Sequence, residues 1–173
     1  ALLLVKNYYI HWFIEHNYGH HKHVGTPLDP ASAVKGETVY EFMPKSFIGQ
    51  IYSSYEIEKK FVEESGRSSL SNRIYWSYIS YFLYAFAFYQ IFGFKVMATS
   101  IMVGLGGPIY LEIINYLEHY GLRREKLQNG EYENVTVHHS WNTPHRITNY
   151  LLFKLQRHSD HHANALKPYQ TLC

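Results

Sequence analysis

An uncharged run of 19 residues, Ile74–Phe92, constrains the fold of this chain more than any other feature. At a rise of about 1.5 Å per residue, a helix of about 20 residues crosses a hydrocarbon core of about 30 Å. A short break at residues 93–95 separates this run from a second uncharged run, Val96–Leu111. Together the two runs predict a membrane hairpin over residues 74–117. A buried helical hairpin in a soluble protein is the alternative that the residues leave open.

The basic residues lie where such a hairpin requires them. Of the 16 Lys and Arg residues, eight lie in residues 1–73 and seven in 118–173, and only Lys95 lies at the turn between the runs. Basic flanks normally stay on the cytoplasmic side of a membrane, so both flanks are predicted to be cytoplasmic. The net charge of +2 is too small to indicate a nucleic-acid partner.

We expect an all-α protein with one domain made of three consecutive parts. Residues 1–73 hold the end of a helix and a polar histidine-rich segment, 74–117 form the hairpin, and 118–173 are polar again. Within the first part, the segment SSYEIEKKFVEESGRSS predicts a charged surface helix that ends near Gly66. The chain opens without a methionine on an apolar stretch that reads as the middle of a helix, so we expect an internal fragment of a longer protein.

Histidine is the residue type that indicates chemistry. The chain has twelve histidines but a single cysteine, Cys173, which excludes an internal disulfide and a site built from several thiolates. His158, His161 and His162 have the spacing i, i+3, i+4, which places side chains on one face of a helix. His16 and His20 have the spacing i, i+4, His21 follows, and His119 ends the second apolar run.

A metal ion is the partner that would let so many neutral imidazoles cluster. Any single pair of helical histidines is more often a surface or core feature, but two triple clusters flank this hairpin. Seven histidines are too many for one structural zinc ion, which closes with four ligands. Nitrogen-rich ligation suits iron, copper, nickel or zinc, so the ligand type alone does not choose the metal.

Four motifs resemble one known group of membrane enzymes. They are EHNYGHH at residues 15–21, NYLEHYG at 115–121, HHSWN at 138–142 and LQRHSDHHA at 155–163. In order and spacing they are similar to the integral-membrane alkane hydroxylases, or alkane 1-monooxygenases, of the histidine-box desaturase and hydroxylase superfamily. The similarity extends to TPLDPAS, GETVYEF and YQTL, and thus covers nearly the whole chain.

The resemblance implies a six-helix integral membrane enzyme of the bacterial inner membrane with a cytoplasmic, histidine-ligated di-iron site. Such an enzyme inserts one oxygen atom of O₂ into the terminal C–H bond of an n-alkane and releases a primary alcohol. It implies rubredoxin, rubredoxin reductase and NAD(P)H as the source of electrons. A single cysteine cannot hold the rubredoxin iron, so the donor would be another domain or protein.

The resemblance also implies a ligand set and residues that orient it. The implied iron ligands are His16, His20, His21, His119, His158, His161 and His162. The family's earlier box, of the form H-E-x-x-H, is absent from this chain, as a fragment would explain. The candidates for orienting the ligands are Glu15, Glu112, Asn115, Glu118, Asn142 and Asp160.

Four of these candidates are suggested by their positions relative to the implied ligands. Glu112, Asn115 and His119 have the spacing i, i+3, i+7 and share a helical face, and a carboxylate inside a span is costly unless it is paired or functional. Glu112 could equally meet water at the membrane interface. Glu118 and Asp160 flank implied ligands and could fix their rings.

Two alternatives to alkane hydroxylation remain open. The close one is another histidine-box membrane oxygenase, either an aromatic-methyl hydroxylase or a fatty-acyl desaturase. The distant one is a metal transporter without enzymatic activity. A transporter would place its ligands near the middle of the membrane, whereas these histidines flank the apolar runs.

Overall fold

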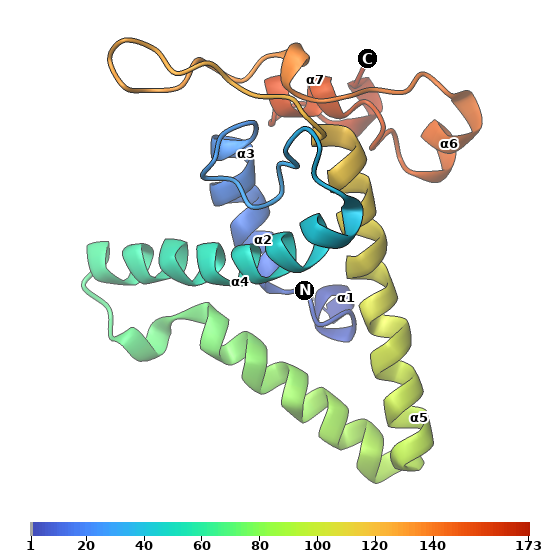
Figure 1. Ribbon diagram of the computed structural model, residues 1–173. Helices are drawn as coiled ribbons and strands as arrows, with labels where there is room; N and C mark the ends of the chain where they lie inside the picture. The colour runs from blue at the N-terminus through green and yellow to red at the C-terminus, as the bar shows by residue number, and fades with distance from the viewer. Residues whose placement is uncertain (1) are drawn as a thin grey trace. The chain divides into compact units, whose positions relative to one another are not determined.

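The computed structural model describes residues 2–173, whose regular secondary structure is helical apart from one isolated antiparallel bridge, Lys126 to Tyr132. The all-α prediction is therefore confirmed (Figure 1). The elements are α1 (Leu2–Lys6), α2 (His11–Ile14), a π-helix (Glu15–His20), α3 (His21–His23), α4 (Val39–Glu64), a 3₁₀ turn (Ser69–Ser71), α5 (Arg73–His119), a second 3₁₀ turn (Val137–His139), α6 (Arg146–Leu151), α7 (His158–Ala163) and a third 3₁₀ turn (Tyr169–Thr171).

The chain divides into two compact units. Unit 1 comprises residues 1–19 and 47–112, and unit 2 comprises residues 20–46 and 113–173. The long helix α5 contributes residues 73–112 to unit 1 and its last turns to unit 2.

Helix α5 carries the apolar runs of the sequence. It has 47 residues and is the one helix among residues 2–173 that is long and apolar enough to cross a membrane. The break expected at residues 93–95 is found at Gly93, whose φ of 77° and ψ of 174° are not helical. Glycine suits this position because it has no Cβ to oppose a positive φ. The segments before and after the break are linked by the hydroxyls of Tyr84 and Ser100, 3.2 Å apart.

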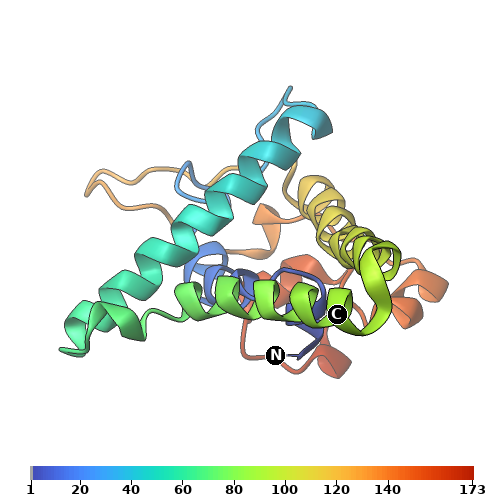
Figure 2. The ribbon, with the colours of Figure 1, turned by 90° about the horizontal axis from the view of Figure 1, so that it is seen from below.

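Helix α4 is joined to α5 by a short turn. The chain leaves α4, turns through the short 3₁₀ segment and continues into α5, whose first segment diverges from α4 (Figure 2). The predicted charged helix is confirmed as the second half of α4, which ends two residues before Gly66. The turn is held by Arg73, whose guanidinium donates to both oxygens of the buried Glu58 at 2.8 and 2.7 Å.

Unit 2 is organised by hydrogen bonds between its loop at residues 24–38 and the end of α5. Tyr116 Oη donates to the carbonyl oxygen of Glu37 at 2.7 Å, and the amide of Gly121 donates to that of Ala33 at 3.0 Å. Beyond α5, the amide of Arg124 donates to the carbonyl oxygen of Gly25 at 2.8 Å. These bonds fix the residues after α3 beside the last turn of α5, where His119 ends the helix.

Candidate metal centre

Four histidines from three separate segments of unit 2 form a buried cluster. His20 ends the π-helix, His119 ends α5, and His158 and His162 lie on α7. Each offers a ring nitrogen, and the four nitrogens all lie within 4.8 Å of one another. Nε2 of His158 lies 3.0 Å from Nε2 of His119 and 2.9 Å from Nε2 of His162. The four side chains are between 0% and 4% exposed.

The geometry of this cluster fits a metal ion. Two ligand nitrogens about 2.1 Å from one ion, at right angles to each other, lie about 3.0 Å apart. Nε2 of a neutral His158 has either one proton or one lone pair, so it can form a hydrogen bond with only one of its two neighbours. A cation would accept the lone pairs of all three Nε2 atoms. Burial, followed by the charge of His158, holds the pKa of His162 well below its ordinary value. His162 is therefore neutral, the form that binds metal.

Local hydrogen bonds hold α7 in place beside α5. Asn142 Oδ1 accepts the amide of Ser159 at 2.8 Å, which satisfies a free donor in the first turn of α7. The amide of Trp141 donates to the carbonyl oxygen of Glu118 at 2.7 Å. The HHSWN segment thus connects the helix that carries His119 with the helix that carries His158.

A carboxylate that the sequence reasoning did not select holds the ring of His20. Asp29 Oδ2 lies 2.9 Å from Nδ1 of His20, and Ser32 Oγ donates to the same oxygen at 2.5 Å. Burial alone would raise the pKa of Asp29, but His20 and Ser32 outweigh it and hold the pKa below its ordinary value. An ionised Asp29 keeps the proton on Nδ1 of His20, which leaves the lone pair on Nε2. Asp29 lies in TPLDPAS, a segment that resembles the family but in which no spacing singles out the aspartate.

Glu118 has the position expected of a residue that orients a ligand. Its Oε2 lies 3.2 Å from Nδ1 of His158, on the opposite side of the ring from the Nε2 that faces the cluster. For His119, Ser140 Oγ lies 3.4 Å from Nδ1. Three of the four cluster rings thus have a polar group at Nδ1.

Two further predicted ligands lie together in unit 2. The ring centroids of His21 and His161 are 4.6 Å apart, and the rings are nearly perpendicular. Burial, and next the charge of His161, lower the pKa of His21 to about 3, and burial lowers that of His161. His16 belongs to unit 1, where its ring stacks on Trp12 with the centroids 4.4 Å apart.

Three more of the residues expected to orient ligands are Glu15, Glu112 and Asn115. Glu15 and Glu112 are buried in unit 1, and Glu112 Oε1 contacts Tyr9 Oη at 2.5 Å and accepts from Gln50 Nε2 at 2.7 Å. Asn115 is buried in unit 2.

Asp160 has partners different from those expected. It accepts from Lys167 Nζ at 2.6 Å, from the amide of Cys173 at 2.8 Å and from Asn164 Nδ2 at 2.9 Å. These contacts hold the C-terminal segment against α7.

Comparisons with known proteins point to the same group of enzymes as the sequence motifs. The chain matches the fatty acid desaturase family over residues 1–172. It is 40% identical over 174 residues to alkane 1-monooxygenase 2 of Alcanivorax borkumensis, with 99% of this chain and 46% of the relative aligned. It is 42% identical to the alkane 1-monooxygenase of Acinetobacter baylyi, with 99% of this chain and 42% of the relative aligned.

A more distant relative is the xylene/toluene monooxygenase hydroxylase component XylM of Pseudomonas putida. It is 27% identical over 165 residues, with 92% of this chain and 42% of the relative aligned. The chain spans less than half the length of the curated relatives it matches. The family match extends over almost every residue and includes all the histidines of the cluster, so the chain belongs to the fatty acid desaturase family.

Proposed function

We propose that the protein is the hydroxylase of an alkane 1-monooxygenase reaction, in which one atom of O₂ enters the terminal C–H bond of an n-alkane. The observation that carries this proposal is the buried four-histidine cluster in a chain about 40% identical to alkane 1-monooxygenases. The lower identity to XylM, 27%, favours an alkane over a methylarene substrate.

The proposed cofactor is a pair of iron ions. His20, His119, His158 and His162 would hold one ion, and we assign His16, His21 and His161 to the other on the basis of the family motifs. The bound irons supply the oxidising power that an unactivated C–H bond demands. The protein's own part is to keep its ligands neutral, oriented and dry. Asp29 and Glu118 fix the rings of His20 and His158, and burial excludes water from the cluster.

An integral membrane location fits both the substrate and the apolar surface of α5. An alkane has no polar handle, so its binding must come from burial at about 0.8 kcal/mol per CH₂. Large apolar side chains of α5 such as Phe82 and Met102 are more than two-thirds exposed, as expected of a helix that faces lipid or an apolar substrate. We propose that residues 74–117 form two spans of a six-helix domain, with both flanks, 1–73 and 118–173, in the cytoplasm.

We propose rubredoxin, reduced by its reductase and NAD(P)H, as the electron donor. The supporting observation is the cysteine count, because a chain with Cys173 alone lacks the thiolates for such a centre.

The test is product analysis with the protein expressed from its whole reading frame in membranes supplied with rubredoxin, reductase and NADH. Octane, p-xylene and a saturated fatty acyl substrate are offered in parallel. The proposal predicts that 1-octanol is the main product and that His162→Ala abolishes it. A methylbenzyl alcohol or an unsaturated acyl product as the main outcome would assign the chain to another histidine-box oxygenase. Metal flux into vesicles without O₂ consumption would indicate a transporter.

A further inference from the structure

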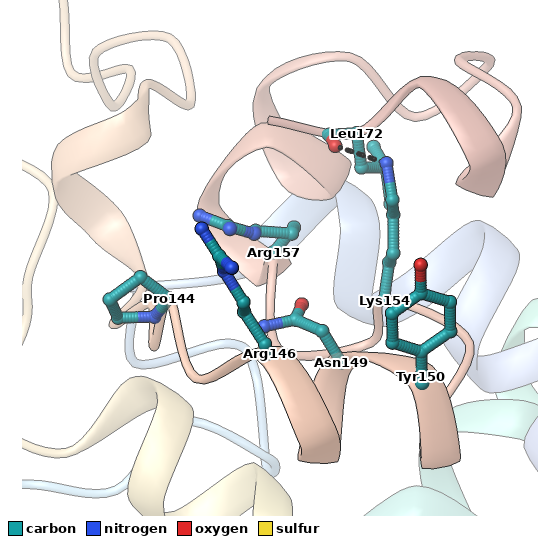
Figure 3. A pocket seen from close by; sticks show the side chains of 7 residues that line it. All are labelled: Pro144, Arg146, Asn149, Tyr150, Lys154, Arg157 and Leu172. Carbon is teal, nitrogen blue, oxygen red and sulfur yellow. Dashed lines mark hydrogen bonds between the residues drawn. The ribbon is translucent and has the colours of Figure 1, made fainter.

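A second feature of unit 2 has no part in the proposed hydroxylation. A cavity of about 440 Å³ lies beside α6 and the segment that leads into α7. Figure 3 shows the side chains that line it. They are Pro144, Arg146, Asn149, Tyr150, Lys154, Arg157 and Leu172. The volume lies within the range of about 300–1,000 Å³ that is usual for small-ligand sites.

Three of the lining side chains are cationic and none is acidic. Figure 3 shows the side chains of Arg146 and Arg157 extending to the same side, with their guanidinium groups next to one another in this view. Neither forms an ion pair with a carboxylate within residues 2–173. Two guanidinium groups that line one cavity repel each other, and an anion bound between them would be attracted to both.

The third cation is positioned by the backbone of the C-terminal segment. Lys154 Nζ donates to the carbonyl oxygens of Gln170 at 2.7 Å and Leu172 at 3.1 Å. An ammonium has three N–H groups, so one remains for a ligand. Lys154 itself has a φ of 61°, in the left-handed region, as does Phe153 before it. The chain therefore adopts an unusual backbone conformation at the residue that brings this ammonium to the cavity wall.

The wall also holds a buried acceptor with no hydrogen-bond partner in the described chain. Asn149 is 8% exposed, and its Nδ2 donates to the carbonyl oxygens of His145 at 2.7 Å and Thr143 at 3.2 Å. These two bonds fix the amide, and its Oδ1 is left buried without a donor. An unpaired buried acceptor costs about 1–3 kcal/mol. A hydroxyl or amine on a bound ligand would satisfy it.

We propose that this cavity binds the phosphate group of a ligand that also carries a hydroxyl or an amine. Two guanidinium forks and one ammonium N–H match the several oxygens of a phosphate, whereas a lone carboxylate offers only two. A phosphate monoester also brings a charge of about −1.5 to −2 against three cations. The donor of the same ligand would meet Asn149 Oδ1. A phospholipid headgroup such as that of phosphatidylglycerol also combines a phosphate with hydroxyl donors, and as a diester it brings one negative charge and two free oxygens.

The first arm of the test uses glycerol 3-phosphate and the protein in a phosphate-free maltoside detergent. Titration calorimetry should show saturable binding that weakens roughly tenfold or more in Arg146→Gln and in Arg157→Gln. Arg123→Gln, an exposed arginine outside the cavity, is the matched control and should change the affinity less than twofold. The iron content of Arg146→Gln should equal that of the wild type, which separates this site from the histidine cluster.

The second arm uses phosphatidylglycerol added back to delipidated protein and detected by native mass spectrometry. Retention of the lipid by the wild type, lost in Arg146→Gln but not in Arg123→Gln, assigns the site to a lipid headgroup. Binding in the first arm alone assigns it to a soluble ester. The proposal is overturned if neither probe binds saturably, or if all three arginine variants weaken binding equally. It is also overturned if polyglutamate binds at the cavity and neither phosphate ligand does, since this would mark a surface for an acidic protein.

Discussion

Asp29 Oδ2 lies 2.9 Å from Nδ1 of His20, and both side chains are almost fully buried in unit 2. A carboxylate at Nδ1 fixes the ring and its tautomer, which directs the lone pair of Nε2 toward a metal. Asp29 is held in turn by Ser32 Oγ and by the amide of Ala31. The loop after α3 is therefore part of the candidate metal centre.

Asp29→Asn should weaken metal binding by about 10–100-fold without unfolding the protein. The amide has the same shape as the carboxylate but carries no charge to stabilise the Nδ1–H of His20. Competition with a chromophoric chelator measures the affinity, and circular dichroism checks the fold. Glu131→Gln, an exposed acid in the loop after α5, is the control and should bind metal as the wild type does. Equal affinity in Asp29→Asn and the wild type would mean that Asp29 does not orient a ligand.

Gly104→Ala should destabilise unit 1, whereas Gly106→Ala, two residues along the same helix, should not. A Cβ at residue 104 would collide with the carbonyl oxygen of Lys6 and press on the ring of Tyr8, while a Cβ at residue 106 meets nothing within 4 Å. Overpacking against backbone costs about 1–3 kcal/mol. The thermal unfolding midpoint in detergent decides the comparison. A pair of variants with the same midpoint would show that Lys6 and Tyr8 do not pack on α5 at Gly104.

Glu58→Gln should lower the stability of unit 1 by about 1–2 kcal/mol at neutral pH. The Glu58 side chain is fully buried, and it accepts two hydrogen bonds from Arg73, whose own side chain is 52% exposed. Burial opposes ionisation, but the bonds from Arg73 prevail and hold the pKa of Glu58 below its ordinary value.

The pH dependence of that variant follows from the direction of the shift. The folded pKa of Glu58 is depressed, so its contribution is complete above the unfolded value, about 4.5, and is lost as the pH falls through the folded pKa. Denaturant unfolding at several pH values should show the difference between wild type and Glu58→Gln shrinking in acid. Glu64→Gln, on the exposed end of α4, should show no such difference. If the difference in the free energy of unfolding stays constant down to acidic pH, the ion pair is not its cause.

Much of the helical architecture was predictable because it depends on local rules. The lack of charge in residues 74–92 and 96–111 predicted the long apolar helix, and glycine at residue 93 predicted the break. The spacing of His158, His161 and His162 placed all three on one face. The structure adds that His158 and His162 join the four-histidine cluster, whereas His161 lies beside His21.

Other features depend on contacts or helix types that no sequence period reveals. The spacing of His16 and His20 suggested an α-helix, but Glu15–His20 is a π-helix, a helix type that the spacing alone does not reveal. Asp29 lies nine residues beyond His20 across an irregular loop, so no repeat connects them. The contacts of Asp160 with Lys167 and Cys173 likewise depend on how the last residues fold back on α7.

The central claim is that His20, His119, His158 and His162 bind iron, and the iron content of a His158→Ala variant tests it most directly. His158 has its Nε2 within 3.0 Å of two other cluster nitrogens, so its removal leaves the fewest ligand contacts. His138→Ala, an exposed histidine in the same part of the chain, is the matched control. After reconstitution with Fe(II) and desalting, elemental analysis should find iron retained by the wild type and His138→Ala and lost from His158→Ala. Equal iron in all three proteins would contradict the account.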